Sequence, residues 1–361
     1  MTPEKIKELR YGWTTGACAT AATKAALTAF FGGDFPDPVT ITLPKGQTPA
    51  FALATEENNP DFAQVSIIKD AGDDPDVTHL ARIIVTVRKS AEGAGIVFRA
   101  GEGVGTVTKA GLPLGVGEPA INPMPRQMMT EVAMEVANRY GMPTDIEIEV
   151  AVENGEELAR HTMNGRLGIL GGLSILGTTG IVVPYSCAAW IASIHRGIDV
   201  ALAAGELHLA ASTGSTSEKA VAAFYNLPET ALLDMGDFAG GVLKYLKKHP
   251  VPRLSIAGGF AKITKLAQGH MDLHSGRSSV DFSWLADQLR ALGADEKLII
   301  SARAANTAMQ VLEEARQAKL PLADLVAKQA QAIAFDIAGQ KTPVEVLVYD
   351  RKGNLVGRSN G

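Results

Sequence analysis

Hydrophobic and polar positions follow different rhythms in the two halves of the chain. Before about residue 195, short runs rich in Val, Ile and Thr are separated irregularly by glycine-rich segments. The runs predict strands at 39–44, 64–72, 81–89 and 145–155, and helical spacing predicts helices at 17–33 and 126–141. Because these elements show no regular strand–helix alternation, we expect residues 1–195 to form an α+β domain.

The second half has a regular rhythm. Short apolar strands at 206–213, 231–236 and 253–259 are each followed by a helical pattern, and a fourth strand is predicted at 345–350. Alternating strands and helices favour a parallel sheet covered on both faces. We therefore predict that residues 196–361 form an α/β domain with a four-stranded parallel sheet, closed by a turn after the last strand.

Composition narrows the functional classes. The 361 residues are 46% hydrophobic and carry a net charge of −5, so the chain lacks the overall positive charge typical of nucleic-acid-binding proteins. Two distant cysteines form neither a disulfide framework nor a zinc pattern. No segment has the ~20 apolar residues that a membrane helix needs, and no secretory signal is recognised. We expect a cytoplasmic protein without nucleic-acid or membrane partners.

Residues at three predicted strand ends in the second half suggest a ligand site. Thr213, Gly214 and Ser215 follow the first strand and begin a helix, where backbone amides can donate to a polar ligand. Asp234 follows the second strand at the spacing of a ribose-binding acid. Gly258 and Gly259 end the third strand. Since both the P-loop and G-x-G-x-x-G patterns are missing, a nucleoside without a phosphate chain fits better; an ordinary helix cap is the alternative.

Polar residues in the first half allow several interpretations. Thr14 and Thr15 precede a helix and either cap it or bind a carboxylate. Asp73 and Asp74 lie in the segment KDAGDDPDVTH, which suits an ordered turn with some substrate contact, or a plain surface loop, better than a metal site, because no EF-hand spacing is present. Arg126, at a helix start after a proline-rich loop, suits carboxylate capture or a rigid connector.

Two further segments add candidates. AKITKLAQGHMDLHSG contains Lys262, Lys265 and His270, which suit anion binding or proton transfer, although structural histidines are the alternative. GRLGILGGLSILGTTGIVV (165–183) is rich in glycine but has no lysine for phosphate. Its glycines either pack tightly or, with Thr178 and Thr179, allow a flat ring or an adenosyl group to approach.

Taken together, these stretches resemble one family. GWTTGACATAATKAA, KDAGDDPDVTH, GEGVGTVTKAGL, GEPAINPMPRQM, GRLGILGGLSILGTTGIVVPYS, TGSTSEKA and FAKITKLAQG occur in the order typical of the cobalt-precorrin-5B C1-methyltransferases of cobalamin biosynthesis. The resemblance implies methyl transfer from S-adenosylmethionine to a corrin-precursor tetrapyrrole, giving cobalt-precorrin-6A. It also implies a first domain related by permutation to the second domain of ribosomal protein S5. It assigns no residue to catalysis.

The implied reaction gives the candidate residues roles. Much of the catalysis can be positioning of donor and acceptor, so no metal is expected. Asp73, Asp74 or His270 is the candidate general base, and cations should meet the substrate carboxylates: Arg126, Arg166, Lys262 and Lys265. A small-molecule kinase and a non-catalytic tetrapyrrole carrier are the rival functions. A homodimer and contacts with neighbouring pathway enzymes are left open.

Overall fold

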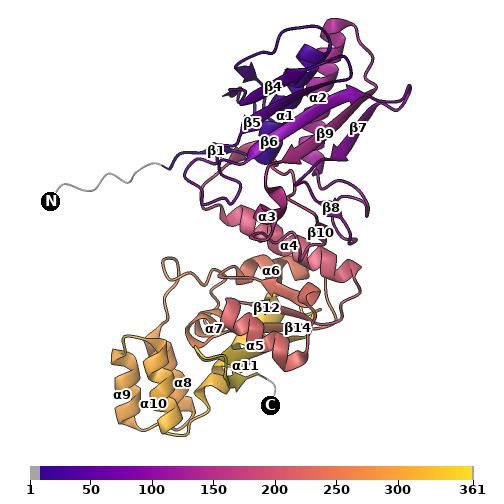
Figure 1. Cartoon of the computed structure of the whole chain (residues 1–361). Coiled ribbons are helices and arrows are strands. Elements are labelled where there is room, and N and C mark those ends of the chain that lie inside the picture. Colours follow the sequence, from indigo (N-terminus) through magenta and orange to yellow (C-terminus); the bar gives the residue numbers. More distant parts are fainter. Residues whose placement is uncertain (1–8, 360–361) are drawn as a thin grey trace, which may run out of the picture. The chain divides into compact units, whose positions relative to one another are not determined.

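The computed structural model describes residues 9–359, which form two compact units, one ending at Cys187 and the other beginning at Ala188 (Figure 1). The sequence placed the division at 195/196 instead. The structure places it in the first turn of helix α4 (Cys187–Ala203), whose Ile194, Ile198 and Ala201 are buried in the core of the second unit. Within the described residues, no helix is both long and apolar enough to cross a membrane.

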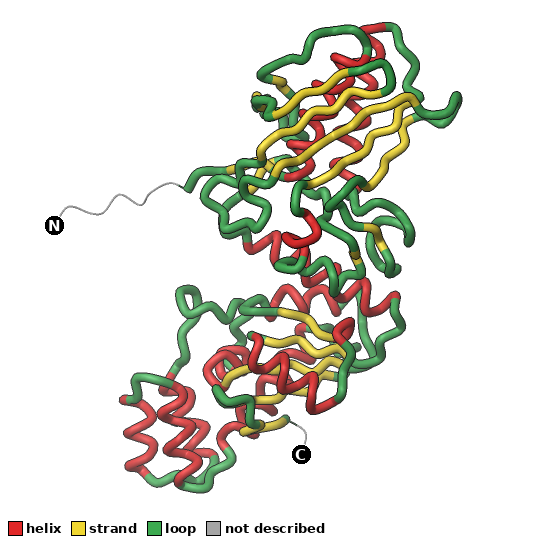
Figure 2. Tube along the Cα trace, in the orientation of Figure 1, coloured by secondary structure: helices red, strands yellow, loops and turns green. Residues whose placement is uncertain are grey.

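The first unit is built on a mixed five-stranded sheet (Figure 2). Its order is β4-β5-β6-β9-β7, with antiparallel neighbours except for β7, which runs parallel to β9. The side chains of β9 alternate, with Ile146, Ile148, Val150 and Val152 buried, as expected when only one face is covered. The strands are β4 (Thr55–Asn58), β5 (Phe62–Ile68), β6 (Arg82–Lys89), β7 (Ile96–Ala100) and β9 (Ile146–Val152).

Two helices cover the apolar face of this sheet. Helix α1 (Thr15–Phe30) is rich in alanine and almost entirely buried, because small side chains let it lie close to β5, β6 and α2. Helix α2 (Pro123–Tyr140) begins with proline and ends at Gly141, whose φ of 62° suits glycine. The α+β character predicted for this half of the chain is therefore confirmed.

Glycine-rich loops in the first unit are held by very short strand pairs. These are β1 (Gly12–Trp13) with β11 (Ile181–Val182), β8 (Thr106–Val107) with β10 (Ile169–Leu170), and β2 (Val39–Thr40) with β3 (Ala50–Phe51). A short helix, α3 (Gly155–Ala159), follows β9. Segments far apart in sequence, around residues 12, 106 and 170–182, are thereby tied to one another.

The second unit has a five-stranded sheet in the order β13-β12-β14-β15-β16. The first four strands are parallel, as predicted: β12 (Leu209–Ser212), β13 (Leu232–Asp234), β14 (Leu254–Gly259) and β15 (Val344–Tyr349). The prediction of a four-stranded sheet ending in a turn was wrong, because β16 (Leu355–Arg358) pairs antiparallel with β15. Arg358 Nε donates to the buried Glu345 carboxylate at 2.6 Å, which fixes β16 against β15.

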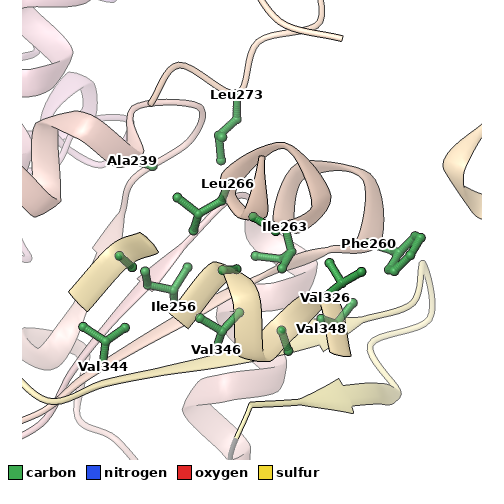
Figure 3. Close-up of a cluster of buried hydrophobic side chains, with 14 of the residues drawn as sticks. Ala239, Ile256, Phe260, Ile263, Leu266, Leu273, Val326, Val344, Val346 and Val348 are labelled. Carbon is green, nitrogen blue, oxygen red and sulfur yellow. The ribbon is translucent and has the colours of Figure 1, made fainter. Parts of the chain in front are cut away.

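Both faces of this sheet are covered. Helix α5 (Ser215–Tyr225) packs on one face, against Ala210, Ala257 and Leu347. The other face carries Ile256, Val344, Val346 and Val348 (Figure 3). It is covered by α4 and three further helices. These are α6 (Ala239–Leu246), α7 (Phe260–Ala267) and α11 (Leu322–Ile337).

Three more helices lie within the connection between β14 and β15: α8 (Phe282–Ala291), α9 (Glu296–Ala304) and α10 (Ala308–Gln317). They pack on one another and reach the remainder of the unit through α7 and α11. A one-turn 3-10 helix (Glu229–Ala231) precedes β13.

Candidate functional site

The order of the strands defines where a ligand is expected in the second unit. The chain leaves β12 to form β13 on one side and then crosses to form β14 on the other side. Such a point of reversal leaves a crevice at the carboxyl ends of the two central strands. The structure therefore brings the predicted Thr213, Gly214, Gly258 and Gly259, with Asp234 at the end of β13, to one edge of the sheet, which we call the switch-point edge.

Backbone and lysine contacts hold the switch-point edge together. The Ser212 carbonyl accepts hydrogen bonds from the amides of Met235 (3.0 Å) and Gly236 (3.2 Å). Lys262 Nζ donates to the Thr213 carbonyl at 2.9 Å and lies 3.0 Å from Asp237 Oδ1. These contacts join the segments that follow β12, β13 and β14, so the edge is preorganised.

The glycines of this edge have two different roles. A Cβ atom on Gly258 would lie 2.8 Å from Thr213 Oγ1, so glycine is needed there for β12 and β14 to end side by side. A Cβ atom on Gly214 or Gly259 would meet no heavy atom of the described chain within 4 Å. Gly214 and Gly259 therefore border open space.

The surroundings of that open space are polar but carry no phosphate-binding pattern. Helix α5 begins at Ser215 with no side-chain cap, and first-turn amides of a helix have no partner within the helix itself. The Ser212 hydroxyl is fully buried and has no hydrogen-bond partner among the described residues. Strand alternation places the Asp234 side chain on the α5 face of the sheet. Amide donors, a hydroxyl and a carboxylate suit a nucleoside.

Lys265 and His270 lie close in sequence to Lys262 but have different surroundings. Lys265 is buried and donates to the Leu273 carbonyl at 2.9 Å, and burial lowers the pKa of its ammonium group. His270 is half-buried and comes after the end of α7, so it shares no helical face with His274. Lys262 is thus the residue of this segment that reaches the switch-point edge.

In the first unit, the predicted substrate residues Thr14 and Thr15 are buried and bonded to the chain itself. Thr14 Oγ1 accepts from the Ala17 amide at 3.2 Å and caps α1. Thr15 Oγ1 accepts from the Leu176 amide at 2.9 Å, while the Gly16 amide donates to the Leu176 carbonyl at 3.0 Å. The start of α1 is thus occupied by segment 165–183.

The aspartates of KDAGDDPDVTH act as ties between loops. Asp73 Oδ2 accepts from the Arg10 amide at 2.8 Å, and Asp74 Oδ1 accepts from the Tyr185 amide at 2.8 Å. The Arg10 side chain binds Asp70, and this hydrogen bond holds the pKa of the Asp70 carboxyl below its usual value. Within residues 9–359, no group of three or more His, Cys, Asp or Glu could hold a metal ion.

Arg126 and Arg166 are also engaged by the chain. Arg126 Nε donates to the Ile121 carbonyl at 2.8 Å, and its Nη2 lies 2.9 Å from Glu118 Oε2, which braces the loop before α2. Arg166 is half-buried, and its carbonyl oxygen accepts from Lys109 Nζ at 3.5 Å. Their binding of substrate stays a prediction.

The glycine-rich segment 165–183 is closed by its neighbours. A Cβ atom on Gly172 would lie 2.2 Å from the Gly103 carbonyl oxygen, and one on Gly177 would lie 2.3 Å from Thr14 Oγ1. Thr179 bonds locally to Ile181, whereas Thr178 is exposed. Both threonines belong to the first unit, whereas Thr213, Asp234 and Gly258 belong to the second unit.

Sequence reasoning missed three residues at or near these sites: Trp190, Asp237 and Lys109. Trp190 in α4 donates its indole N–H to the Asp234 carbonyl at 3.2 Å. Asp237 pairs with Lys262, and Lys109 lies beside Arg166. Asp237 could have been suggested by its position three residues after Asp234, whereas the contacts of Trp190 with the β13 loop have no local sequence signal.

A pocket of about 600 Å³ lies beside α9 and α10, lined by residues that include Lys297, Ser301 and Glu314. None of the residues predicted for the ligand site lines this pocket. The switch-point edge, and not the helical pocket, therefore collects the predicted donor residues of the second unit.

Comparison with known proteins covers nearly the whole chain. The family model described as CbiD matches residues 2–184, and the model described as the CbiD C-terminal domain matches residues 272–360. A protein of Paramagnetospirillum magneticum named Cobalt-precorrin-5B C(1)-methyltransferase is 60% identical over 350 residues, covering 97% of this chain and 98% of that protein. A protein of the same name from Brucella abortus (strain S19) is 58% identical over 361 residues, covering 99% and 97%.

A solved structure is also similar. It is a crystal structure of a cobalamin biosynthesis protein (cbiD) from Archaeoglobus fulgidus, with 27% identity and a TM-score of 0.40, covering 74% of this chain and 83% of that chain. The family and the methyltransferase class predicted from the sequence motifs are confirmed by the relatives. With a family model over more than half of its length and relatives near 60% identity from end to end, the chain belongs to the CbiD family.

Proposed function

We propose that this chain transfers a methyl group from S-adenosylmethionine to C1 of cobalt-precorrin-5B, giving cobalt-precorrin-6A, and that it binds the donor at the switch-point edge of the second unit. The substrate and the methylated carbon follow from the relatives, which are named Cobalt-precorrin-5B C(1)-methyltransferase and are 58–60% identical over nearly full length. The observation that supports the location is the open space beside Gly214 and Gly259, at the reversal of strand order.

The residues of the edge fit an adenosyl donor. The Asp234 carboxylate accepts from the ribose hydroxyls, since an acid at this strand end has that role in nucleotide-type sheets. Gly214 and Gly259 let the ligand approach the backbone closely, and the first amides of α5 donate to its polar atoms. Thr213 contributes its backbone, because its side chain is packed against Gly258.

When bound, S-adenosylmethionine supplies an electrophilic sulfonium methyl group. The protein then needs to hold donor and acceptor carbon in line at near-attack distance, and this alone can lower the barrier greatly. Ties such as Lys262 to the Thr213 carbonyl, and Lys262 to Asp237, keep the edge in one geometry. His270 in the second unit is our preferred general base, because Asp73 and Asp74 already accept hydrogen bonds from backbone amides.

The substrate carries acetate and propionate carboxylates, so cations should meet it. Lys262 is about one-third exposed, and Lys109 lies beside Arg166. Lys262, Lys109 and Arg166 are therefore the preferred partners of the substrate carboxylates. Arg126 and Lys265 are secondary candidates, because Arg126 is only 25% exposed and already paired with Glu118, and Lys265 is buried. Thr178 and Thr179 stay candidates for donor contact, and Thr14 and Thr15 for substrate contact.

Several finer features belong to this proposal and rest on the sequence alone. They are a first unit related by permutation to the second domain of ribosomal protein S5, a cytoplasmic location, homodimer formation and contact with neighbouring pathway enzymes.

The test is calorimetric titration of the full chain with S-adenosylhomocysteine. Asp234→Ala should weaken binding about tenfold or more, because two ribose hydroxyls lose a charged acceptor. Asp287→Asn on α8 is the matched control and should bind like the wild type. Wild-type affinity in a folded Asp234→Ala protein would remove the donor from this edge.

A further inference from the structure

One aromatic side chain at the switch-point edge is exposed in a fixed position. Trp190 is 46% exposed, and its indole N–H donates to the Asp234 carbonyl at 3.2 Å. A Cβ atom on Gly236 would lie 3.6 Å from Cζ2 of the indole, and the Phe238 ring centroid is 6.4 Å away. Three residues of the β13–α6 segment therefore hold one side of the indole.

The position of Trp190 follows from the helix that carries it. Ile194, Ile198 and Ala201 lie at helical spacing after Trp190 and are buried in the core of the second unit. Trp190 continues this apolar stripe into the first turn of α4, where it contacts Asp234, the last residue of β13, and the segment that follows it. The same helix face that is buried in the core thus carries a large aromatic ring at the switch-point edge.

We propose that the exposed face of Trp190 is the platform on which the adenine ring of the methyl donor stacks. This inference rests on the proposed function, because it needs the donor to lie at this edge. Base–aromatic stacking is strong enough to dominate the binding of a nucleoside.

The neighbouring contacts favour adenine over the sulfonium end of the donor. The indole N–H of Trp190 is bonded to the backbone carbonyl of Asp234, while strand alternation places the carboxylate assigned to the ribose on the α5 face of the sheet. Because ribose and adenine are directly joined, a ring next to the ribose partner is placed for the base. Gly236, with φ 54°, adds no side chain between the indole and this edge.

Tryptophan fluorescence gives a direct test on the full chain, which has two other tryptophans, Trp13 and Trp284. Adding S-adenosylhomocysteine or adenosine should quench the wild-type emission. Trp190→Phe should abolish the quench, whereas Trp13→Phe and Trp284→Phe should keep it. A quench that survives Trp190→Phe, or that is absent in a wild-type protein shown by calorimetry to bind, would overturn the proposal.

Affinity separates stacking from a structural role. Trp190→Leu should weaken adenosine and S-adenosylhomocysteine binding by the same factor, about tenfold. Trp190→Phe keeps an aromatic face but loses the bond to Asp234, so under stacking it should keep most of the affinity. If Trp190→Phe is as weak as Trp190→Leu, the indole only supports the Asp234 loop, and the proposal fails.

Two more outcomes complete the design. A loss confined to S-adenosylmethionine, with adenosine unaffected, would place the indole against the sulfonium and refute adenine stacking. If only the stacking proposal is wrong, Asp234→Ala binds S-adenosylhomocysteine weakly, whereas Trp190→Leu binds it like the wild type. Failure of the proposed donor location appears as wild-type binding in both variants, with melting temperatures showing that each is folded.

Discussion

Glycines are abundant in two regions of this protein, but they have opposite surroundings. In segment 165–183 of the first unit, a Cβ atom added to Gly172 or Gly177 would lie only 2.2–2.3 Å from another atom of the chain. At the switch-point edge of the second unit, Gly214 and Gly259 face open space. At Gly172 and Gly177 the space is filled by the chain itself, whereas Gly214 and Gly259 border space that the chain leaves open.

The difference shows what a glycine-rich sequence does and does not determine. In both regions, the glycines allow another group, either a part of the chain or a ligand, to approach the backbone closely. Whether that partner is another part of the chain or a ligand depends on tertiary contacts, such as Gly103 against Gly172. The denser glycine cluster is therefore the packed region, and the sparser pair borders the candidate site.

The largest effect is expected from breaking a buried ion pair elsewhere in the first unit. Lys69 is almost completely buried, and its Nζ lies 2.7 Å from Asp76 Oδ2. Asp76→Asn should lower the free energy of unfolding by about 3 kcal/mol, because a buried ammonium loses its counter-charge. Urea unfolding measures this effect. Combining Asp76→Asn with Lys69→Met should recover much of the loss, and no recovery would argue against the electrostatic cause.

This ion pair also predicts a pH dependence. Burial alone would raise the pKa of Asp76, but Lys69 and hydrogen bonds from Thr78 hold it below its usual value. A lowered folded pKa contributes stability above the ordinary carboxyl value of about 3.9, and this contribution is lost as the pH falls through the folded pKa. The stability difference between wild type and Asp76→Asn should therefore shrink below about pH 4. A difference independent of pH would contradict this assignment.

The next largest effect compares adjacent glycines of segment 165–183. Gly172→Ala should destabilise the protein by about 3 kcal/mol, because the added methyl group meets the Gly103 backbone and not a movable side chain. Gly171→Ala meets nothing within 4 Å and should cost only about 1 kcal/mol, from its φ of 84°. Thermal unfolding of the two variants measures this, and equal losses would show that segment 165–183 is not closed by packing.

The smallest effect on stability, and the clearest effect on binding, is expected at the open edge. Gly259→Val should leave the free energy of unfolding within about 0.5 kcal/mol, since Gly259 has φ −73° and open surroundings. The same change should weaken S-adenosylhomocysteine binding about tenfold, because the side chain fills ligand space. Gly165→Val, another glycine with open surroundings, is the control. Unchanged binding in Gly259→Val would mean that the open space at Gly259 is not used by the donor.

Much of the fold of the second unit could be predicted from its sequence. Regular alternation of strands and helices predicted β12 to β15 and their parallel arrangement, and with it the meeting of Gly214 and Gly259 at one edge. Strand β16 was missed, because its short segment Leu355–Arg358 has little apolar pattern and depends on the distant Glu345.

The candidate site was predicted less completely. Asp73, Asp74 and Arg126 have the residue types of ligand-binding groups, yet they satisfy backbone amides and carbonyls of neighbouring loops. A polar side chain in a loop has the same sequence signature in both cases. Trp190 could not be proposed from the sequence, because its contacts are with residues 44 or more positions later.

The helices α8 to α10 lie between two strands that are nevertheless immediate neighbours, β14 and β15. Because the entropy of closing a chain segment grows only with the logarithm of its length, this connection can be lengthened at small thermodynamic cost. A fluorescent or affinity domain inserted in the turn at Gly293, between α8 and α9, would join neither strand and would replace no residue of the switch-point edge. The connection is accordingly a suitable place in the second unit for immobilising or labelling the enzyme.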